Sequence, residues 1–239
     1  TGGEPTMHPD VLGIVEDAVR RGLVVGMNSN GRRFASDGFA ARARDAGLDH
    51  LQVTIESHRA DVHDAMVGAR AWEQSTRGVR AAREAGILTI TNTTLTRANA
   101  RELDALLDFL AHDLGLTTFA MNAMIHSGGG AANPDAIPPE ELAAILVRVR
   151  EGAQERGLRF LWYTPTEYCR LSPVELEIGA KRCNAGEYSM CVEPDGSVLP
   201  CQSYYASAGN ILRDPWEAIW NGALFTSFRD RELDPASSW

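Results

Sequence analysis

The sequence has no excess of basic residues and no long apolar run, and these two absences exclude several classes of protein. Lysine and arginine together number 23 against 32 acidic residues, which gives a net charge of −9. A nucleic-acid-binding domain needs a basic stripe or patch, so we expect no nucleic-acid partner. No apolar segment approaches the roughly 20 residues of a transmembrane helix, and no signal peptide is visible, so we expect a cytoplasmic protein without a membrane partner.

Cysteine is also scarce, but three of the four cysteines lie in one short segment. Cys183, Cys191 and Cys201 flank a β-turn signature at Pro194–Gly196, between two short apolar stretches. Such a turn joins the strands of a hairpin, with the glycine supplying the positive φ angle. We therefore expect the three thiols to converge at the open end of this hairpin.

Three converging thiols favour a metal or iron–sulfur site over disulfides, because disulfides are typical of secreted proteins. Structural zinc sites usually contain paired C-x-x-C spacings, and none is present. An iron–sulfur cluster with further ligands elsewhere fits better, since four thiolates are its usual complement. Buried thiols without a ligand role remain the alternative, and for Cys169, which follows several aromatic residues, this is the favoured interpretation.

The rest of the chain alternates between helical and strand patterns, and a glycine of the helix-ending type precedes each strand. Expected strands are Leu23–Met27, Leu51–Ile55, Leu88–Leu95 and Phe119–Ile125, and expected helices cover about Pro9–Arg21, Phe34–Ala46, Trp72–Ala85 and Ala100–Leu114. A further helix is expected at about Pro139–Arg156 and a further strand at Leu158–Tyr163. Asn99 and Asp214 are expected to cap the helices that follow them. The pattern predicts parallel β/α units, in a partial barrel or in a doubly wound open sheet.

In parallel β/α folds, ligands bind at the carboxyl ends of the strands. The polar residues at or just beyond these ends are therefore candidates for a binding site, with turn or cap roles as the alternative. They are Gly2, Gly3 and Glu4; Asn28, Ser29 and Asn30; Glu56 and Ser57; Asn92, Thr94 and Arg97; and Asn122, His126 and Ser127. The loop that begins at His126 could act as a lid that contacts substrate.

The Gly2-Gly3-Glu4-Pro5 turn and the cysteine hairpin together resemble the radical S-adenosylmethionine (SAM) enzymes that carry a SPASM-type auxiliary-cluster domain. The hairpin matches in spacing, since Cys183 is followed by twelve residues, Gly196, four residues and Cys201. The family's C-x-x-x-C-x-x-C motif and the later SPASM cysteines are absent, so we expect an internal fragment. The resemblance implies an α/β fold: a partial (β/α)6 TIM-like barrel over residues 1–165 that lacks its first strands, a linker over 166–182, and an incomplete auxiliary-cluster domain over 183–239.

The resemblance also implies cofactors and site residues. SAM would bind to Gly2, Gly3, Glu4, Glu56, Ser57, Asn92, Thr94, Asn122 and Arg97, with Arg97 pairing with the methionine carboxylate. Cys183 and Cys201, with Cys191 as a third, would hold an auxiliary iron–sulfur cluster, while the ligands of the SAM-cleaving [4Fe-4S] cluster would lie upstream.

By this resemblance, the intact enzyme would cleave SAM reductively to a 5′-deoxyadenosyl radical and take hydrogen from a peptide, a protein side chain or a tetrapyrrole-type small molecule. A flavodoxin or ferredoxin would supply the electron, and the fragment alone would be inactive. A non-catalytic metal-binding scaffold and an iron-free β/α-barrel lyase or hydrolase remain the alternatives.

Overall fold

The computed structural model describes residues 3–125, 133–166 and 168–230. The chain divides into two compact units, Thr1–Lys181 and Arg182–Trp239. The first unit contains a parallel sheet with helices, and the second contains a small antiparallel sheet with two helices. Among the described residues, no helix is both long and apolar enough to cross a membrane.

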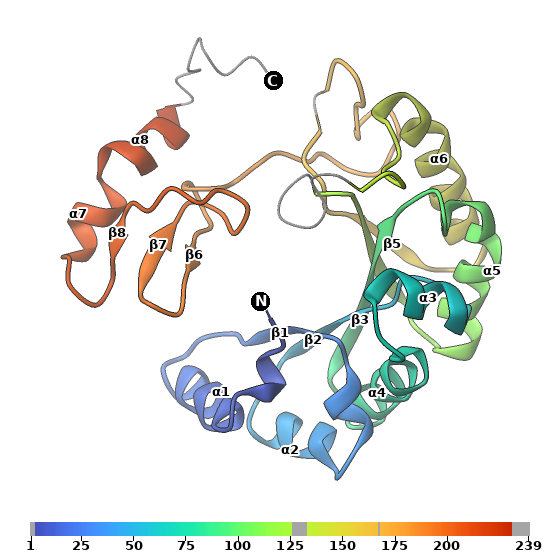
Figure 1. The fold of residues 1–239 in the computed structure, drawn as a ribbon, viewed down its shortest axis with the longest axis horizontal. Coiled ribbons are helices and arrows are strands. Elements are labelled where there is room, and N and C mark those ends of the chain that lie inside the picture. The colour runs from blue at the N-terminus through green and yellow to red at the C-terminus, as the bar shows by residue number, and fades with distance from the viewer. Residues whose placement is uncertain (1–2, 126–132, 167, 231–239) are drawn as a thin grey trace. The chain divides into compact units, whose positions relative to one another are not determined.

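The sheet of the first unit has five parallel strands in the order of the sequence (Figure 1). They are β1 (Gly26–Ser29), β2 (His50–Thr54), β3 (Leu88–Leu95), β4 (Thr118–Ala123) and β5 (Arg159–Trp162). Each strand pairs in parallel with the next along the chain. This confirms the prediction of neighbouring parallel strands, and a chain of β/α units is the simplest way to connect them.

The helices of the first unit lie along the convex side of the curved sheet (Figure 1). The α-helices are α1 (Val11–Arg20), α2 (Phe39–Asp45), α3 (Ala60–Val67), α4 (Trp72–Glu84), α5 (Leu103–Asp108) and α6 (Pro139–Glu155). Short 3₁₀ turns occur at η1 (Pro5–Met7), η2 (Arg32–Ala35) and η3 (Ala100–Glu102), and α5 continues into a π-helical stretch, η4 (Phe109–Asp113).

The two faces of the sheet differ in polarity. On the helix side, Leu51 and Val53 of β2 are buried and belong to the main hydrophobic core. On the other face the strands carry polar side chains that neighbour one another in register, namely Asn28, Gln52, Thr54, Asn92, Thr94 and Asn122. Parallel sheets are usually covered by apolar residues on both faces. The concave face is therefore more polar than is usual for a parallel sheet, although Ile90, Ala120 and Leu161 share it.

Several local expectations were wrong, each for a physical reason. The first strand was expected at Leu23–Met27, but β1 covers Gly26–Ser29. Leu23 and Val24 are exposed and are not part of the buried sheet. Asn99 precedes η3 but makes no capping bond, since its amide is engaged elsewhere. Asp214 also fails to cap its helix, because Oδ2 accepts from the backbone N–H of Asn210. Helix α3 was not predicted.

The first unit extends to Lys181, beyond the expected boundary at residue 165. Leu171 is buried in the main core, and Leu176 and Ile178 pack against it. Arg150 of α6 also donates to the Leu176 carbonyl oxygen over 3.1 Å. The described part of the segment expected to be a linker therefore folds onto the barrel unit.

The second unit contains the expected hairpin. Strands β6 (Cys191–Val192), β7 (Ser197–Leu199) and β8 (Gly209–Asn210) form an antiparallel sheet, followed by α7 (Trp216–Trp220) and α8 (Ala223–Asp230). The β6–β7 turn contains Gly196 at a φ of 87°, as its signature predicted. Val198, Ile219 and Phe225 form a small core of their own.

Candidate functional site

The Glu4 carboxylate ties the first turn of the chain to the carboxyl end of β1. Its Oε1 accepts from Thr6 N (3.0 Å), Thr6 Oγ1 (2.6 Å) and Ser29 Oγ (2.9 Å), and its Oε2 accepts from Asn30 N (2.7 Å). Oε1 is thereby fully used, whereas Oε2 retains capacity for a further donor. Gly3 precedes it with a φ of 68° and open space around its Cα. Gly2 lies outside the described residues.

Glu56 follows the carboxyl end of β2 and is buried, with 8% of its surface exposed. Its Oε2 accepts from the backbone N–H of Thr94 over 2.7 Å. Burial raises the pKa of Glu56 to about 7, and the hydrogen bonds from Thr94 lower it only in part. Near neutral pH this carboxyl group can therefore be either charged or protonated, and in the protonated form it can donate a hydrogen bond.

The neighbours of Glu56 hold its backbone in place. Its N–H donates to Nδ1 of His63 over 3.1 Å, and burial lowers the pKa of that imidazole. The next residue, Ser57, is also buried, and its Oγ accepts from Arg59 N. The carbonyl oxygen of Ser57 accepts from the indole N–H of Trp72.

Asn99 joins the ends of β2 and β3 through one buried amide. Its Nδ2 donates to the carbonyl oxygens of Glu56 and Thr94, both over 2.9 Å, and its Oδ1 accepts from Thr96 N over 2.9 Å. These contacts explain why its side chain does not cap the following helix. They set the separation of Glu56 and Thr94 at the edge of the sheet.

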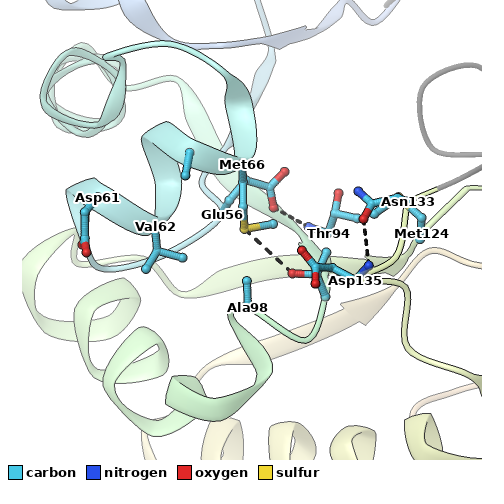
Figure 2. A pocket seen from close by; sticks show the side chains of 11 residues that line it. Glu56, Asp61, Val62, Met66, Thr94, Ala98, Met124, Asn133 and Asp135 are labelled. Carbon is cyan, nitrogen blue, oxygen red and sulfur yellow. Dashed lines mark hydrogen bonds between the residues drawn. The ribbon is translucent and has the colours of Figure 1, made fainter.

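Glu56 and Thr94 line a cavity of about 620 Å³ at this edge (Figure 2). Its remaining walls come from α3, from the turn after β3 and from the region after β4, and they contain Asp61, Val62, Ala65, Met66, Thr96, Ala98, Met124, Asn133 and Asp135. Figure 2 shows Met66 and Glu56 on one side of the cavity and Asn133 and Asp135 on another. Helix α3, which the sequence did not reveal, supplies four of these residues.

Of the described residues predicted to share this pocket, Gly3, Glu4, Ser57, Asn92 and Asn122 do not line the cavity, contrary to the expectation. Asn92 and Asn122 lie on the concave face, where Asn92 Nδ2 donates to Asn122 Oδ1 over 2.7 Å. Asn92 Oδ1 is buried and accepts no hydrogen bond from the described residues. Glu4 and Ser57 nevertheless lie at the same edge of the sheet, because they follow or bind the carboxyl ends of neighbouring parallel strands.

Arg97 already has a carboxylate partner within the chain. Its two terminal nitrogens donate to the two oxygens of Glu141 in α6, both over 2.8 Å. The guanidinium fork is thus occupied, which corrects the expectation that it pairs with a methionine carboxylate. His126 and Ser127, together with most of the expected lid, lie outside the described residues.

The cysteines are all free thiols. Cys191 pairs with Leu199 in the hairpin, and Cys201 follows two residues beyond Leu199. The pKa of the Cys191 thiol is raised by burial, by Glu193 and by the nearby Cys201. Within the ranges that the structure describes, no three His, Cys, Asp or Glu side chains are grouped to hold a metal ion. The expected convergence of three thiols is therefore not observed among the described residues, and a ligand role for Cys183 stays a prediction.

Residues 1–110 match the model of the radical SAM superfamily, and residues 183–238 match that of an iron–sulfur cluster-binding domain, SPASM. The chain belongs to the radical SAM superfamily. Members of this superfamily with a SPASM domain use SAM and [4Fe-4S] clusters as cofactors, and the sequence resemblance is confirmed. Both matched regions are parts of the chain described above as separate units.

Curated relatives include three kinds of enzyme. The chain is 28% identical to an AdoMet-dependent heme synthase of Methanosarcina barkeri, over 97% of this chain and 70% of that protein. It is 30% identical to a PqqA peptide cyclase of Streptomyces rochei and 28% identical to a mycofactocin maturase MftC of Mycobacterium ulcerans, in each case over 96% of this chain and 63% of the relative. The chain therefore spans less than two thirds of the length of the latter two.

Solved radical SAM structures share the fold. Streptococcus suis SuiB bound to precursor peptide SuiA has a TM-score of 0.79 at 15% identity, covering 95% of this chain and 54% of that chain. Native anSMEcpe with bound AdoMet has a TM-score of 0.68 at 16% identity, covering 95% of this chain and 67% of that chain. These likenesses confirm the expected TIM-like barrel architecture of the α/β unit.

The polar edge of the sheet fits SAM. Its buried Asn92 Oδ1 can still accept a hydrogen bond, and the 620 Å³ cavity falls within the size range of ligand pockets. The described residues do not fit a complete iron–sulfur cluster, since no three potential ligands are grouped. The two thiols at the open end of the hairpin are chemically suited to contribute to such a cluster.

Proposed function

We propose that this chain is the SAM-binding and auxiliary-domain portion of a radical SAM/SPASM enzyme that acts on a peptide. When bound and reduced by a cluster, SAM supplies a radical that removes hydrogen from a substrate. The single observation that carries the proposal is the polar edge of the parallel sheet, where Glu4, Glu56 and Asn92 offer acceptors around the strand ends.

In this proposal, each acceptor binds a different part of SAM. Oε2 of Glu4, with the Gly2–Gly3 backbone, accepts from the amino group, whose positive charge complements the carboxylate. Glu56 and Ser57 face the ribose, and Asn92, Thr94 and Asn122 orient the adenine. Arg97 is not part of this set, because Glu141 occupies it.

A peptide substrate is favoured by the relatives and neighbours that are named for peptides. The Streptomyces relative is a PqqA peptide cyclase, and the SuiB structure contains a precursor peptide. The heme synthase relative makes a tetrapyrrole-type substrate the second candidate. A flavodoxin or ferredoxin is the proposed electron donor.

Replacing Glu4 by Ala should weaken SAM binding to the full-length protein by at least tenfold, because the amino group loses a charged acceptor and the turn loses four hydrogen bonds. Isothermal titration calorimetry under anaerobic conditions measures the change. Glu16→Ala removes the same charge from an exposed site on α1 and should leave the affinity unchanged. Equal affinities of the unsubstituted protein and Glu4→Ala would count against the role of Glu4.

We also propose that Cys183, Cys191 and Cys201 contribute ligands to an auxiliary cluster. Changing Cys183 and Cys201 together to Ala should lower the iron content of the anaerobically reconstituted full-length protein by about one four-iron cluster. Iron and sulfide analysis measures this loss. Cys169→Ala serves as the control, because this exposed thiol is outside the hairpin. An iron content unaffected by the double change would remove these cysteines from the ligand set.

A further inference from the structure

A second cavity lies at the carboxyl edge of the sheet, beside the first. It has a volume of about 200 Å³ and is lined by the end of β4, the start of α6 and the segment after β5. Met124 lines both this cavity and the 620 Å³ cavity, so the two are neighbours. The smaller volume lies below the range of about 300–1,000 Å³ typical of pockets for whole ligands. It is too small for SAM and suits a single side chain.

A short segment, Asn133–Ile137, forms the partition between the two cavities. Asn133 and Asp135 line the larger cavity, whereas Ile137 lines the smaller one. The partition is fastened to the turn after β3, since Arg97 N donates to the Asp135 carbonyl oxygen over 2.9 Å and Ala136 bridges to Thr96. This gives the Arg97–Glu141 pair a role, because it links the same turn to α6 next to the partition.

Most of the residues that line the smaller cavity are apolar, and each of its two threonine hydroxyls already makes one hydrogen bond. Thr164 Oγ1 accepts from Ala123 N over 2.8 Å, and Thr166 Oγ1 donates to the Leu171 carbonyl oxygen over 2.8 Å. The methyl groups of these threonines remain for contact, together with the buried side chains of Ile137, Leu142 and Leu171. Arg170 also lines the cavity but already interacts with other residues of the chain, so an incoming charged group finds few free partners in exchange for its water, whereas an apolar group gains from burial.

We propose that this cavity is a specificity subsite that takes one apolar side chain of the peptide substrate, next to the position where SAM acts. The inference rests on the proposed function for the identity of the neighbouring ligand. A cavity of about 150 Å³ with apolar walls accepts benzene, so one of 200 Å³ accommodates side chains from leucine to tyrosine in size. Its place at the strand ends is where parallel β/α folds bind their ligands.

The test uses four probes, the N-acetyl amides of leucine, tyrosine, glutamate and lysine, and saturation-transfer NMR on the full-length protein with SAM. The leucine and tyrosine probes should give signals, and Ile137→Trp should lower them at least fivefold by filling the cavity. Ile145→Trp, at a partly buried position of α6 that does not line the cavity, should leave the signals unchanged. Equal signals from all four probes, signals from none, or signals unaffected by Ile137→Trp would overturn the proposal.

A second variant protects the test against misfolding of Ile137→Trp. Ile137→Ala enlarges the cavity and should shift the preference from the leucine probe to the tyrosine probe by at least threefold, and an unchanged ratio would overturn the proposal. The proposed function is checked separately, by 5′-deoxyadenosine formation from SAM in the unsubstituted protein. Absence of that product would refute the radical SAM chemistry, while the probe signals would still report on the subsite.

Discussion

The free energy of unfolding of a Glu56→Gln variant is expected to rise relative to that of the unsubstituted protein as the pH increases. Between pH 5 and pH 8 this difference should grow by about 2 kcal/mol in favour of the variant. The pKa of the folded carboxyl group is raised to about 7 from an ordinary value of 4.5, mainly by burial. Well below pH 4.5 the Glu56 carboxyl group is protonated in both the folded and the unfolded state, so its burial does not lower the folding stability through ionisation. As the pH rises from 4.5 through 7, the unfolded state ionises more readily than the folded state, so folding stability is lost. Gln carries no charge and escapes this loss.

Urea unfolding followed by circular dichroism at pH 5, 6, 7 and 8 measures the difference. Glu16→Gln, at an exposed position of α1, corrects for the general effect of removing one carboxylate. The gap between Glu56→Gln and the unsubstituted chain should widen with each step in pH. If the free energies of unfolding of Glu56→Gln and the unsubstituted chain differed by the same amount at every pH, Glu56 would ionise at its ordinary pKa.

Replacing Gly78 by Ala is expected to destabilise the first unit by about 2 kcal/mol, despite the better helix propensity of Ala. Gly78 lies in the middle of α4, and a Cβ there would come within 2.0 Å of the Gly31 carbonyl oxygen. That oxygen belongs to the backbone after β1, which cannot rotate away as a side chain can. The same turn receives a hydrogen bond from Ser75 Oγ to the Asn30 carbonyl oxygen and donates from Asn30 N to Glu4.

Gly152→Ala in α6 is the matched control for Gly78→Ala. Its new Cβ would approach Leu107 Cδ1 within 2.7 Å, and this methyl group ends a flexible side chain that can move. The change in unfolding free energy should therefore stay within about 1 kcal/mol of zero, because the propensity gain offsets the crowding. Equal effects of the two substitutions in urea denaturation would show that the turn after β1 yields to the extra methyl group.

The strands could be predicted largely because their signals are local. Strand β3 begins and ends at Leu88 and Leu95 as expected, since Gly86 ends the preceding helix and β-branched residues follow. Helix α3 was missed because it is only eight residues long and follows closely on a strand. This helix supplies one wall of the large cavity, so a gap in the predicted fold became a gap in the predicted site.

The candidate site was predictable in position but not in its pairings. The rule that ligands bind at strand ends selected Glu56, Thr94 and Asn122, and the structure places all three at that edge. The long-range partners of Asn99 and Arg97 could not be foreseen, because Glu56 and Glu141 lie on elements far away in the sequence. Asn99 binds Glu56 at a separation of 43 residues and Arg97 binds Glu141 at 44, whereas the Asn99 oxygen that would cap the helix accepts from Thr96 N, three residues before it.

The polar concave face of the sheet affects how this fold can diverge. The apolar residues that drive folding, such as Leu51 and Val53, point to the helix side, whereas Gln52 and Asn92 point away from it. Substitutions of the polar residues on the concave face remove little buried apolar area. They therefore lower the free energy of unfolding only slightly, and loss of stability is what limits sequence change. A lineage can therefore exchange these positions and acquire new chemistry without first evolving a more stable scaffold.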